Sequence, residues 1–487
     1  MTDTITPAET TLEELDAIVA AAAEAAGRMA VASPSERGAW LRAAARALEA
    51  QRDVLVPLAQ EESHLPEGRL SGELSRTTGQ LELLAAEAES GAVWDVVIDH
   101  ADPDWKPVPR PDLRRVTVPL GPVAVYAASN FPFAFSVAGG DTAAALAAGC
   151  PVVVKAHPGH PRLSVAVAEI VAAALAEAGA PGGLGLVHGF DAGIALIKHP
   201  AIRASAFTGS IGAGRALFDL AAGRPEPIPF FGELGSVNPV VVTPAASAAR
   251  GAEIGAGYAG SLSLGVGQFC TNPGILLTPA GSEVIGAAAE ALASVPAAPM
   301  LNERIAAGYA SGLEELRGVE GVRVVVDGST GDAPTPSLLA VDIDRFTEVE
   351  RLRQECFGPV SIVVEYQDPA DVVALAGTFD GQLTATVHGE PGEEVSAELV
   401  GVLSAVAGRV VWNDWPTGVA VTYAMQHGGP YPAATTAGTS VGTAAVQRFG
   451  RPVAYQDVPQ ELLPPALRDD NPWHLPRRVD GVWEHRP

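Results

Sequence analysis

The sequence predicts an α/β protein built on parallel β-sheets that are covered by helices on both faces. The first observation behind this prediction is a regular alternation of short apolar runs with helical runs between residues 121 and 243. The second is that runs such as Val123–Tyr126 and Val152–Lys155 are almost wholly apolar, which is typical of strands buried on both faces. The third is length, since 487 residues allow about three domains of ~150 residues.

Individual elements follow from periodicity and from turn residues. Residues 11–93 read as helices, with Leu12, Leu15 and Val19 on one apolar stripe and Ser33 at a cap-like start. Residues 235–430 read as a second α/β unit. Between residues 121 and 243 the expected strands are 123–126, 152–155, 184–187, 204–207 and 240–243, and the expected helices are 137–148, 161–178, about 191–198 and one from 211.

Composition excludes several classes of function. A net charge of −26 argues against nucleic acid and anionic membranes as partners, and no apolar run reaches the ~20 residues of a bilayer span. Three cysteines form neither a disulfide framework nor a zinc spacing, so we expect no metal site. The first residues carry no basic and apolar leader pattern, and a reducing cytoplasm is the expected location.

Cys270 is the first candidate for chemistry. It ends a small-residue run between Gly267 and Pro273, so a tight turn with an exposed backbone N–H is expected there. A thiol with a pKa near 8.5 needs a base or a positive environment to become a nucleophile. An ordinary buried cysteine is the alternative interpretation.

Glu233 is the candidate base. It stands among apolar residues and glycines, and burial there is expected to raise its pKa until it can take a proton from water. A solvated turn carboxylate is the alternative. Asn130 follows the apolar strand 123–126 and can aim its amide at an oxyanion.

Taken together, these motifs resemble the aldehyde dehydrogenase superfamily over nearly the whole chain. The resemblance rests on the order and spacing of seven segments, which include those of Asn130, Glu233 and Cys270. It implies a Rossmann-type cofactor domain over residues 1–103 and 119–234, a catalytic domain over 235–430, and oligomerisation or bridging segments over 104–118 and 431–487. The seven segments are 130–133, 154–155, 207–210, 233–235, 267–270, 355–359 and 412–418.

The resemblance also implies that the enzyme binds a dinucleotide. Lys155 would reach the ribose or phosphate, and a modified glycine-rich loop would face the pyrophosphate. Glu355 would hold the nicotinamide ribose and Phe357 would pack beside the nicotinamide, whereas Cys356 between them is expected to be structural. Without the resemblance, Lys155 and Glu355 read as surface residues and Phe357 as core. The cofactor residues of the loop are Thr208, Gly209, Ser210 and Gly214.

NADP is the expected cofactor, with NAD as the alternative. In many relatives an acidic residue three positions after the lysine repels a 2′-phosphate, and here that position is Pro158. His157 and His160 are candidate helpers, although a structural or solvent-facing role is the simpler reading. Asp191 is a candidate carboxylate that would oppose the phosphate.

The tail and the segment 69–81 resemble the ketoglutarate-semialdehyde (2,5-dioxovalerate) dehydrogenase branch, although 69–81 also reads as an ordinary amphipathic helix. We therefore expect oxidation of that semialdehyde, or of a related one, through a thiohemiacetal and thioester on Cys270. The alternatives are a broad-range aliphatic aldehyde dehydrogenase, a CoA-acylating relative, and a non-catalytic binding protein. An exposed strand near 112–119 needs a partner edge. The matching segment of the family belongs to an oligomerisation arm, so the resemblance implies a homodimer or homotetramer.

Overall fold

A computed structural model describes residues 7–484 of the chain. Residues 1–6, which contributed to the expectation of no leader, lie outside the described residues, as do 485–487. Within the described part, no helix is long and apolar enough to cross a membrane.

The first sheet has five strands, all parallel, in the order β5-β4-β3-β6-β7. This order confirms the parallel sheet predicted from the alternation. β3, the first strand of this sheet along the chain, lies between β4 and β6, so the strand order reverses at this point. Ligands bind such sheets in the crevice at the carboxyl ends of the strands where the order reverses. The strands are β3 (Val123–Tyr126), β4 (Val152–Lys155), β5 (Leu184–Val187), β6 (Ala204–Thr208) and β7 (Phe230–Glu233).

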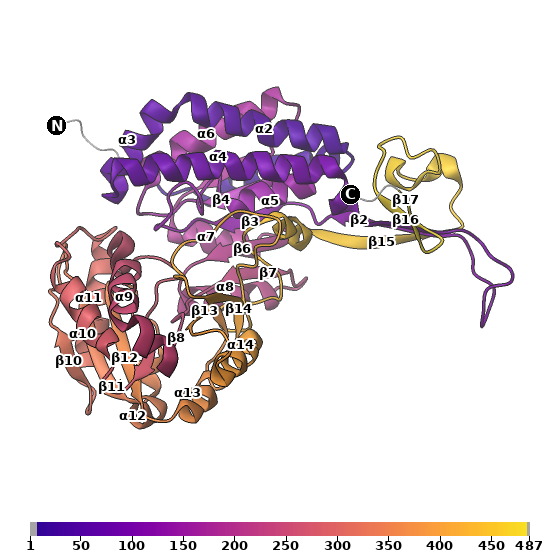
Figure 1. Cartoon of the computed structure of the whole chain (residues 1–487). Helices are drawn as coiled ribbons and strands as arrows, with labels where there is room; N and C mark the ends of the chain where they lie inside the picture. The colour runs from indigo at the N-terminus through magenta and orange to yellow at the C-terminus, as the bar shows by residue number, and fades with distance from the viewer. Residues whose placement is uncertain (1–6, 485–487) are drawn as a thin grey trace.

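Helices cover both faces of this sheet, and Figure 1 shows the helices between residues 34 and 90 stacked on one side of it. Ser33 caps α2 through a reciprocal capping box with Glu36, as its place in the sequence indicated. The helices are α1 (Leu12–Ala30), α2 (Pro34–Ala50), α3 (Arg52–Ser63), α4 (Glu67–Ser90), α5 (Gly140–Ala148), α6 (Pro161–Glu177), α7 (Phe190–Lys198) and α8 (Ile211–Ala222), with the 3-10 turn η1 (Ala92–Trp94).

The second sheet has seven strands in the order β10-β11-β12-β9-β8-β13-β14, of which only β10 is antiparallel to its neighbour. Its strands are β8 (Val240–Val242), β9 (Ile275–Pro279), β10 (Arg323–Val326), β11 (Ser337–Asp342), β12 (Val360–Tyr366), β13 (Gln382–His388) and β14 (Ala407–Trp412). Its helices are α9 (Pro244–Ser263), η2 (Leu264–Gly267), α10 (Glu283–Ala293), α11 (Glu303–Arg317), α12 (Ile343–Glu348), η3 (Glu350–Arg353), α13 (Pro369–Ala376) and α14 (Glu394–Val406).

A third sheet forms an arm that projects from the body of the molecule (Figure 1). Its order is β15-β2-β1-β16-β17. The exposed strand expected near 112–119 is β2, and its neighbours are β1 and β15 of the same chain. The strands are β1 (Val96–Asp99), β2 (Leu113–Pro119), β15 (Gly450–Gln456), β16 (Arg477–Val479) and β17 (Val482–Glu484), with 3-10 turns η4 (Thr443–Phe449), η5 (Gln460–Leu462) and η6 (Pro465–Leu467) nearby.

The two larger sheets face each other end to end across the functional region. β7 ends at Glu233, at the carboxyl edge of the first sheet, and the chain then enters β8 of the second sheet. Cys270 precedes β9, and Glu355 and Phe357 precede β12, so these three residues lie at the amino edge of the second sheet. β9 and β12 are direct neighbours, which places the two segments side by side.

Candidate active site

Cys270 lies on a turn that the glycines before it make possible. The chain leaves α9 through η2, where Gly267 has a φ of +66°. A Cβ on Gly267 would stand 2.4 Å from the carbonyl oxygen of Gly358, so only glycine lets this turn approach the loop before β12. On the other side of the turn, the carbonyl of Pro273 accepts a hydrogen bond of 2.8 Å from the Tyr258 hydroxyl, which fixes the chain after Cys270.

Three functional groups meet at the sulfur. The Cys270 Sγ lies 3.6 Å from Nε2 of His427, and the same nitrogen lies 2.9 Å from Oε1 of Glu233. The other carboxylate oxygen of Glu233 accepts a hydrogen bond from the Ser440 hydroxyl. The thiol and the carboxylate therefore both face Nε2 of His427, while Nδ1 is buried without a partner among the described residues. An imidazole next to a thiol can serve as its base.

His427 is the site residue that the sequence analysis missed. It comes from the irregular segment after β14 and is fully buried. A lone histidine before two glycines and a proline carries no spacing that points to a nucleophile 157 positions away. Only the three-dimensional fold brings it to Cys270.

The prediction that Glu233 has a raised pKa was wrong. Burial does push the pKa of this carboxyl upward, but the facing His427 and the hydrogen bond from Ser440 outweigh the effect of burial. The net pKa lies below the ordinary value for glutamate. Glu233 is therefore held as a carboxylate, and it can stabilise a positive charge on His427.

The Cys270 thiol has the opposite shift. Burial, with the nearby negative charges of Glu233 and Glu355, raises its pKa well above the usual value, and its own backbone N–H opposes this in part. A thiol in this environment is protonated at neutral pH, so it needs a base within reach. His427 occupies that position.

Asn130 lies beside the turn that carries Cys270. Its side-chain Nδ2 donates to the Gln268 carbonyl at 3.1 Å, two residues before Cys270. A primary amide has two N–H donors, and this contact uses one of them. The second donor has no acceptor among the hydrogen bonds of the described residues.

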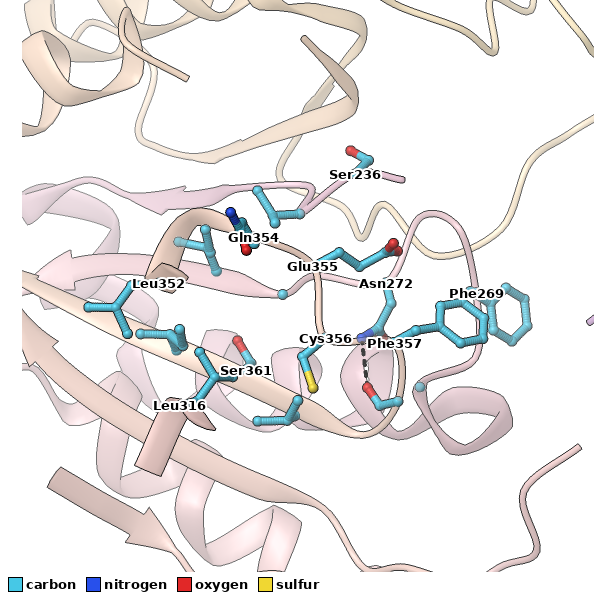
Figure 2. A pocket seen from close by; sticks show the side chains of 17 residues that line it. Ser236, Phe269, Asn272, Leu316, Leu352, Gln354, Glu355, Cys356, Phe357 and Ser361 are labelled. Atoms are coloured by element: carbon cyan, nitrogen blue, oxygen red, sulfur yellow. Dashed lines mark hydrogen bonds between the residues drawn. The ribbon is translucent and has the colours of Figure 1, made fainter. Parts of the chain in front are cut away.

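A pocket opens on the side of the turn that faces β12. Figure 2 shows Glu355 and Phe357 on the loop that crosses it, with Phe269 beside Phe357 and the Cys356 sulfur turned away from Glu355. Burial raises the pKa of Glu355 to about 7. The Cys356 Sγ lies 3.9 Å from the Tyr309 carbonyl, and burial raises its pKa to about 12, which suits a structural thiol.

Lys155 ends β4 at the carboxyl edge of the first sheet and is half-buried. Burial lowers its pKa, the positive charge of Arg304 lowers it further, and Glu9 opposes this. His160 is buried, and its ring bonds with the Ala128 carbonyl and the Ser164 hydroxyl, as expected for a structural residue. Burial chiefly lowers the pKa of His157 to about 3, which keeps that ring neutral.

The glycine-rich loop joins β6 to α8. Ser210 caps α8, and Gly209 and Ser210 are exposed at its N-terminus. A Cβ on Gly212 would meet no atom within 4 Å, which leaves the approach to this helix N-terminus open. Gly214 differs, because a Cβ there would lie 2.1 Å from Leu234, so close packing of α8 accounts for this glycine.

The fold and this geometry define a class of protein. A cysteine nucleophile with a histidine and a carboxylate lies between a doubly wound sheet and a second α/β unit. An open helix N-terminus and a lysine lie at the edge of the first sheet, where dinucleotides bind. These features describe a dinucleotide-dependent enzyme that works through a covalent bond to cysteine.

Comparison with known proteins identifies the family. The aldehyde dehydrogenase family matches residues 2–450, so the chain belongs to the aldehyde dehydrogenase family, whose members depend on NAD(P). An α-ketoglutaric semialdehyde dehydrogenase 2 from Azospirillum brasilense is 46% identical over 92% of this chain and 87% of its own. An α-ketoglutaric semialdehyde dehydrogenase from Acinetobacter baylyi is 42% identical over 97% of this chain and 92% of its own.

Solved structures confirm the fold. An aldehyde dehydrogenase from Bacillus cereus superimposes with a TM-score of 0.77 at 22% identity, covering 92% of this chain and 89% of its own. An NAD-dependent aldehyde dehydrogenase from Sinorhizobium meliloti gives a TM-score of 0.76 at 23% identity, covering 93% and 88%. The resemblance found in the sequence motifs is thus confirmed for family and fold.

Proposed function

We propose that this chain oxidises α-ketoglutarate semialdehyde, or a related semialdehyde, to the carboxylic acid with NADP⁺, and that Cys270 is the nucleophile. The observation that carries the proposal is the contact of the Cys270 sulfur with His427, which in turn bonds with Glu233. The two semialdehyde dehydrogenases described above, 46% and 42% identical to this chain, support the choice of substrate.

The reaction begins with the thiol proton. In the tautomer whose hydrogen is on Nδ1, His427 accepts this proton at Nε2, the imidazolium then donates that N–H to the Glu233 carboxylate, and the thiolate of Cys270 attacks the aldehyde carbon. The new oxyanion is stabilised by the free N–H of the Asn130 amide and by the Cys270 backbone N–H. When bound, the oxidised nicotinamide takes up the hydride whose loss turns this adduct into a thioester.

Hydrolysis of the thioester completes the reaction. Glu233 and His427 share one hydrogen bond, so together they act as the base that removes a proton from the attacking water. In this proposal Glu233 is a base in combination with His427, since its own lowered pKa makes it a weak base alone. The carboxylic acid then leaves and the Cys270 thiol is restored.

The residues at the edge of the first sheet suit the proposed cofactor. Lys155 supplies a positive charge, Arg304 of α11 lies near enough to lower the pKa of Lys155, and position 158 is a proline. Thr208, Gly209 and Ser210 would hold the pyrophosphate at the N-terminus of α8. Glu355 and Phe357 would hold the nicotinamide end beside Cys270.

Assembly and location are parts of the same proposal. β15 is an edge strand of the arm sheet, since its outer side has no neighbour among the described strands. An edge of this kind pairs readily with another chain, which supports a homodimer or homotetramer. The cytoplasmic location and the domain boundaries given above remain predictions.

The test measures NADPH and NADH formation by the purified protein with α-ketoglutarate semialdehyde, succinate semialdehyde and medium-chain aliphatic aldehydes. We expect the highest kcat/KM for α-ketoglutarate semialdehyde with NADP⁺ and no requirement for CoA. A preference for apolar aldehydes would reject the proposed substrate. A preference for NAD⁺, or comparable efficiencies with both cofactors, would reject the proposed cofactor.

A further inference from the structure

Two arginines on α4 face the active site without a carboxylate partner. Arg69 and Arg76 are seven positions apart, which puts them on the same side of the helix, with Glu73 between them. Both side chains are half-buried, and Nη1 of each is buried with no hydrogen-bond partner. In the part of the chain that the structure describes, neither guanidinium lies within the 4.0 Å that defines an ion pair with a carboxylate.

Their remaining contacts place both arginines beside the nucleophile. Arg69 lies over the rings of Phe131 and Phe269, at 5.1 and 4.9 Å from the ring centroids, and Phe269 directly precedes Cys270. Its Nη2 donates to the Asn130 carbonyl at 2.7 Å. Arg69 therefore lines the same space as the turn of Cys270 and the loop of Asn130.

Arg76 lies near the His427 side of the site. It lies 5.4 Å from the centroid of Phe135, whose ring packs against His427 at 6.4 Å. The charges of Cys270 and Glu233 act on its pKa, although burial dominates and lowers it. Its Nη2 contacts the Val419 carbonyl at 3.5 Å, a long hydrogen bond that leaves the guanidinium largely unused.

Glu73 does not neutralise this pair. One of its oxygens accepts from the backbone N–H groups of Phe133 and Ala134, at 2.8 and 3.0 Å, and the other has no partner. Burial raises the pKa of Glu73, and its two backbone hydrogen bonds and the charges of Arg69 and Arg76 oppose this in part. Glu73 supports the loop after Asn130, and its charge acts on both arginines without a hydrogen bond to either. Nη1 of each arginine therefore remains a buried donor that an anionic group could satisfy.

We propose that Arg69 and Arg76 bind the carboxylate end of the substrate, so that the site selects aldehydes carrying a carboxylate a few carbons away. This inference rests on the proposed function, because it names the residues that recognise a 2-oxo acid semialdehyde. Guanidinium groups only donate hydrogen bonds, and a 2-oxo acid offers only acceptors at that end. In the substrate, the carboxylate lies roughly 5 Å from the aldehyde carbon along four C–C bonds.

The test compares α-ketoglutarate semialdehyde with pentanal, an uncharged aldehyde with the same number of carbons, in the wild type and in Arg76→Gln. For the semialdehyde we expect kcat/KM to fall about 10- to 100-fold, mainly through KM, because a charge-assisted hydrogen bond is lost. For pentanal we expect a change of less than about threefold. Arg42→Gln on α2, whose guanidinium pairs with Glu82 and Glu89, is the matched control and should change neither substrate.

Arg69→Gln should behave differently from Arg76→Gln. Arg69 also bonds with the Asn130 carbonyl, so its loss should lower kcat for both aldehydes in addition to raising KM for the anionic one. If Arg76→Gln does not fold, Arg76→Lys keeps the charge without the planar pair of donors and should give a smaller loss of the same kind.

A binding measurement separates recognition from turnover. We expect 2-oxoglutarate, the product, to bind to Cys270→Ala in isothermal titration calorimetry, and to bind about 10- to 100-fold more weakly when Arg76→Gln is added. If the wild type prefers pentanal, the proposed function fails. If the wild type prefers the semialdehyde but Arg76→Gln keeps that preference and the product affinity, the assignment to the arginines fails and the proposed function stands.

Discussion

Replacing His427 with glutamine tests how the buried thiol of Cys270 becomes a nucleophile. Glutamine can still donate a hydrogen bond to Glu233, but it cannot accept a proton from the thiol. The variant therefore removes the base and preserves most of the polar contact. We expect a large loss of activity with little loss of folded protein.

The magnitude follows from the contact of 3.6 Å between Sγ and Nε2. At that separation an imidazolium and a thiolate attract by roughly 4 to 5 kcal/mol with an effective dielectric constant of about 20. General-base catalysis contributes about 10²- to 10⁴-fold, or roughly 3 to 5 kcal/mol, which is the same range. We therefore expect kcat/KM to fall about 10²- to 10⁴-fold in His427→Gln.

The direct assay is alkylation of Cys270 by iodoacetamide as a function of pH. In the wild type, burial and the charges of Glu233 and Glu355 raise the thiol pKa, and Nε2 of His427 lies 3.6 Å from the sulfur as the proposed proton acceptor. Without His427, the carboxylate of Glu233 faces the sulfur alone. The alkylation profile of the variant should therefore move to higher pH, and alkylation at neutral pH should slow.

Two comparisons make this result decisive. His199→Gln removes a histidine at the C-terminus of α7, outside the site, and should leave both the profile and kcat/KM unchanged. An alkylation profile of His427→Gln that coincides with the wild type would refute the role of His427 as the base, even if turnover were lower.

Three further predictions concern the same site. Asn130→Ala should lower kcat about 10²- to 10³-fold, since it removes one oxyanion donor, and should leave the alkylation profile unchanged; an unaltered kcat would assign the oxyanion to other donors. In the wild type, cofactor affinity measured by fluorescence titration should rise as the pH increases through about 7. Burial raises the pKa of Glu355 to about 7, and this carboxyl must lose its proton before both oxygens can accept hydrogen bonds from a ribose. Glu355→Gln should lose this pH dependence, and a pH dependence that persists would contradict the assignment of Glu355. Zn²⁺ should inhibit and EDTA should restore activity, since ligand atoms of Cys270, His427 and Glu233 lie within 4.8 Å of one another; inhibition that remains in His427→Gln would place the ion elsewhere.

The parts of the fold that depend on local pattern were predictable from the sequence. The strands at 123–126, 152–155 and 184–187 are mostly apolar and each follows a proline or a glycine, and their predicted bounds agree with the structure. Local rules also predicted the cap at Ser33. The family and the fold were predicted from the order and spacing of the sequence motifs.

The chemistry of the site was only partly predictable, because it depends on contacts between distant segments. Cys270 and Glu233 were found through their motifs, but the pKa of Glu233 was wrong since His427 and Ser440 come from the far end of the chain. The helix at 69–81 was expected as part of an amphipathic stretch. No helical periodicity shows that Arg69 and Arg76 lack carboxylate partners, since that depends on what the fold places around them.

The most direct test of the central claim is to identify the residue that carries the acyl group. The reaction of the Glu233→Gln variant with α-ketoglutarate semialdehyde and NADP⁺ is stopped with acid, and its peptides are analysed by mass spectrometry. We expect one acyl group on the peptide that contains Cys270, because thioester formation continues while hydrolysis is slowed. An acyl group on the peptide of Cys150 or Cys356, or NADPH formation at the wild-type rate with no acylated peptide, would contradict the account.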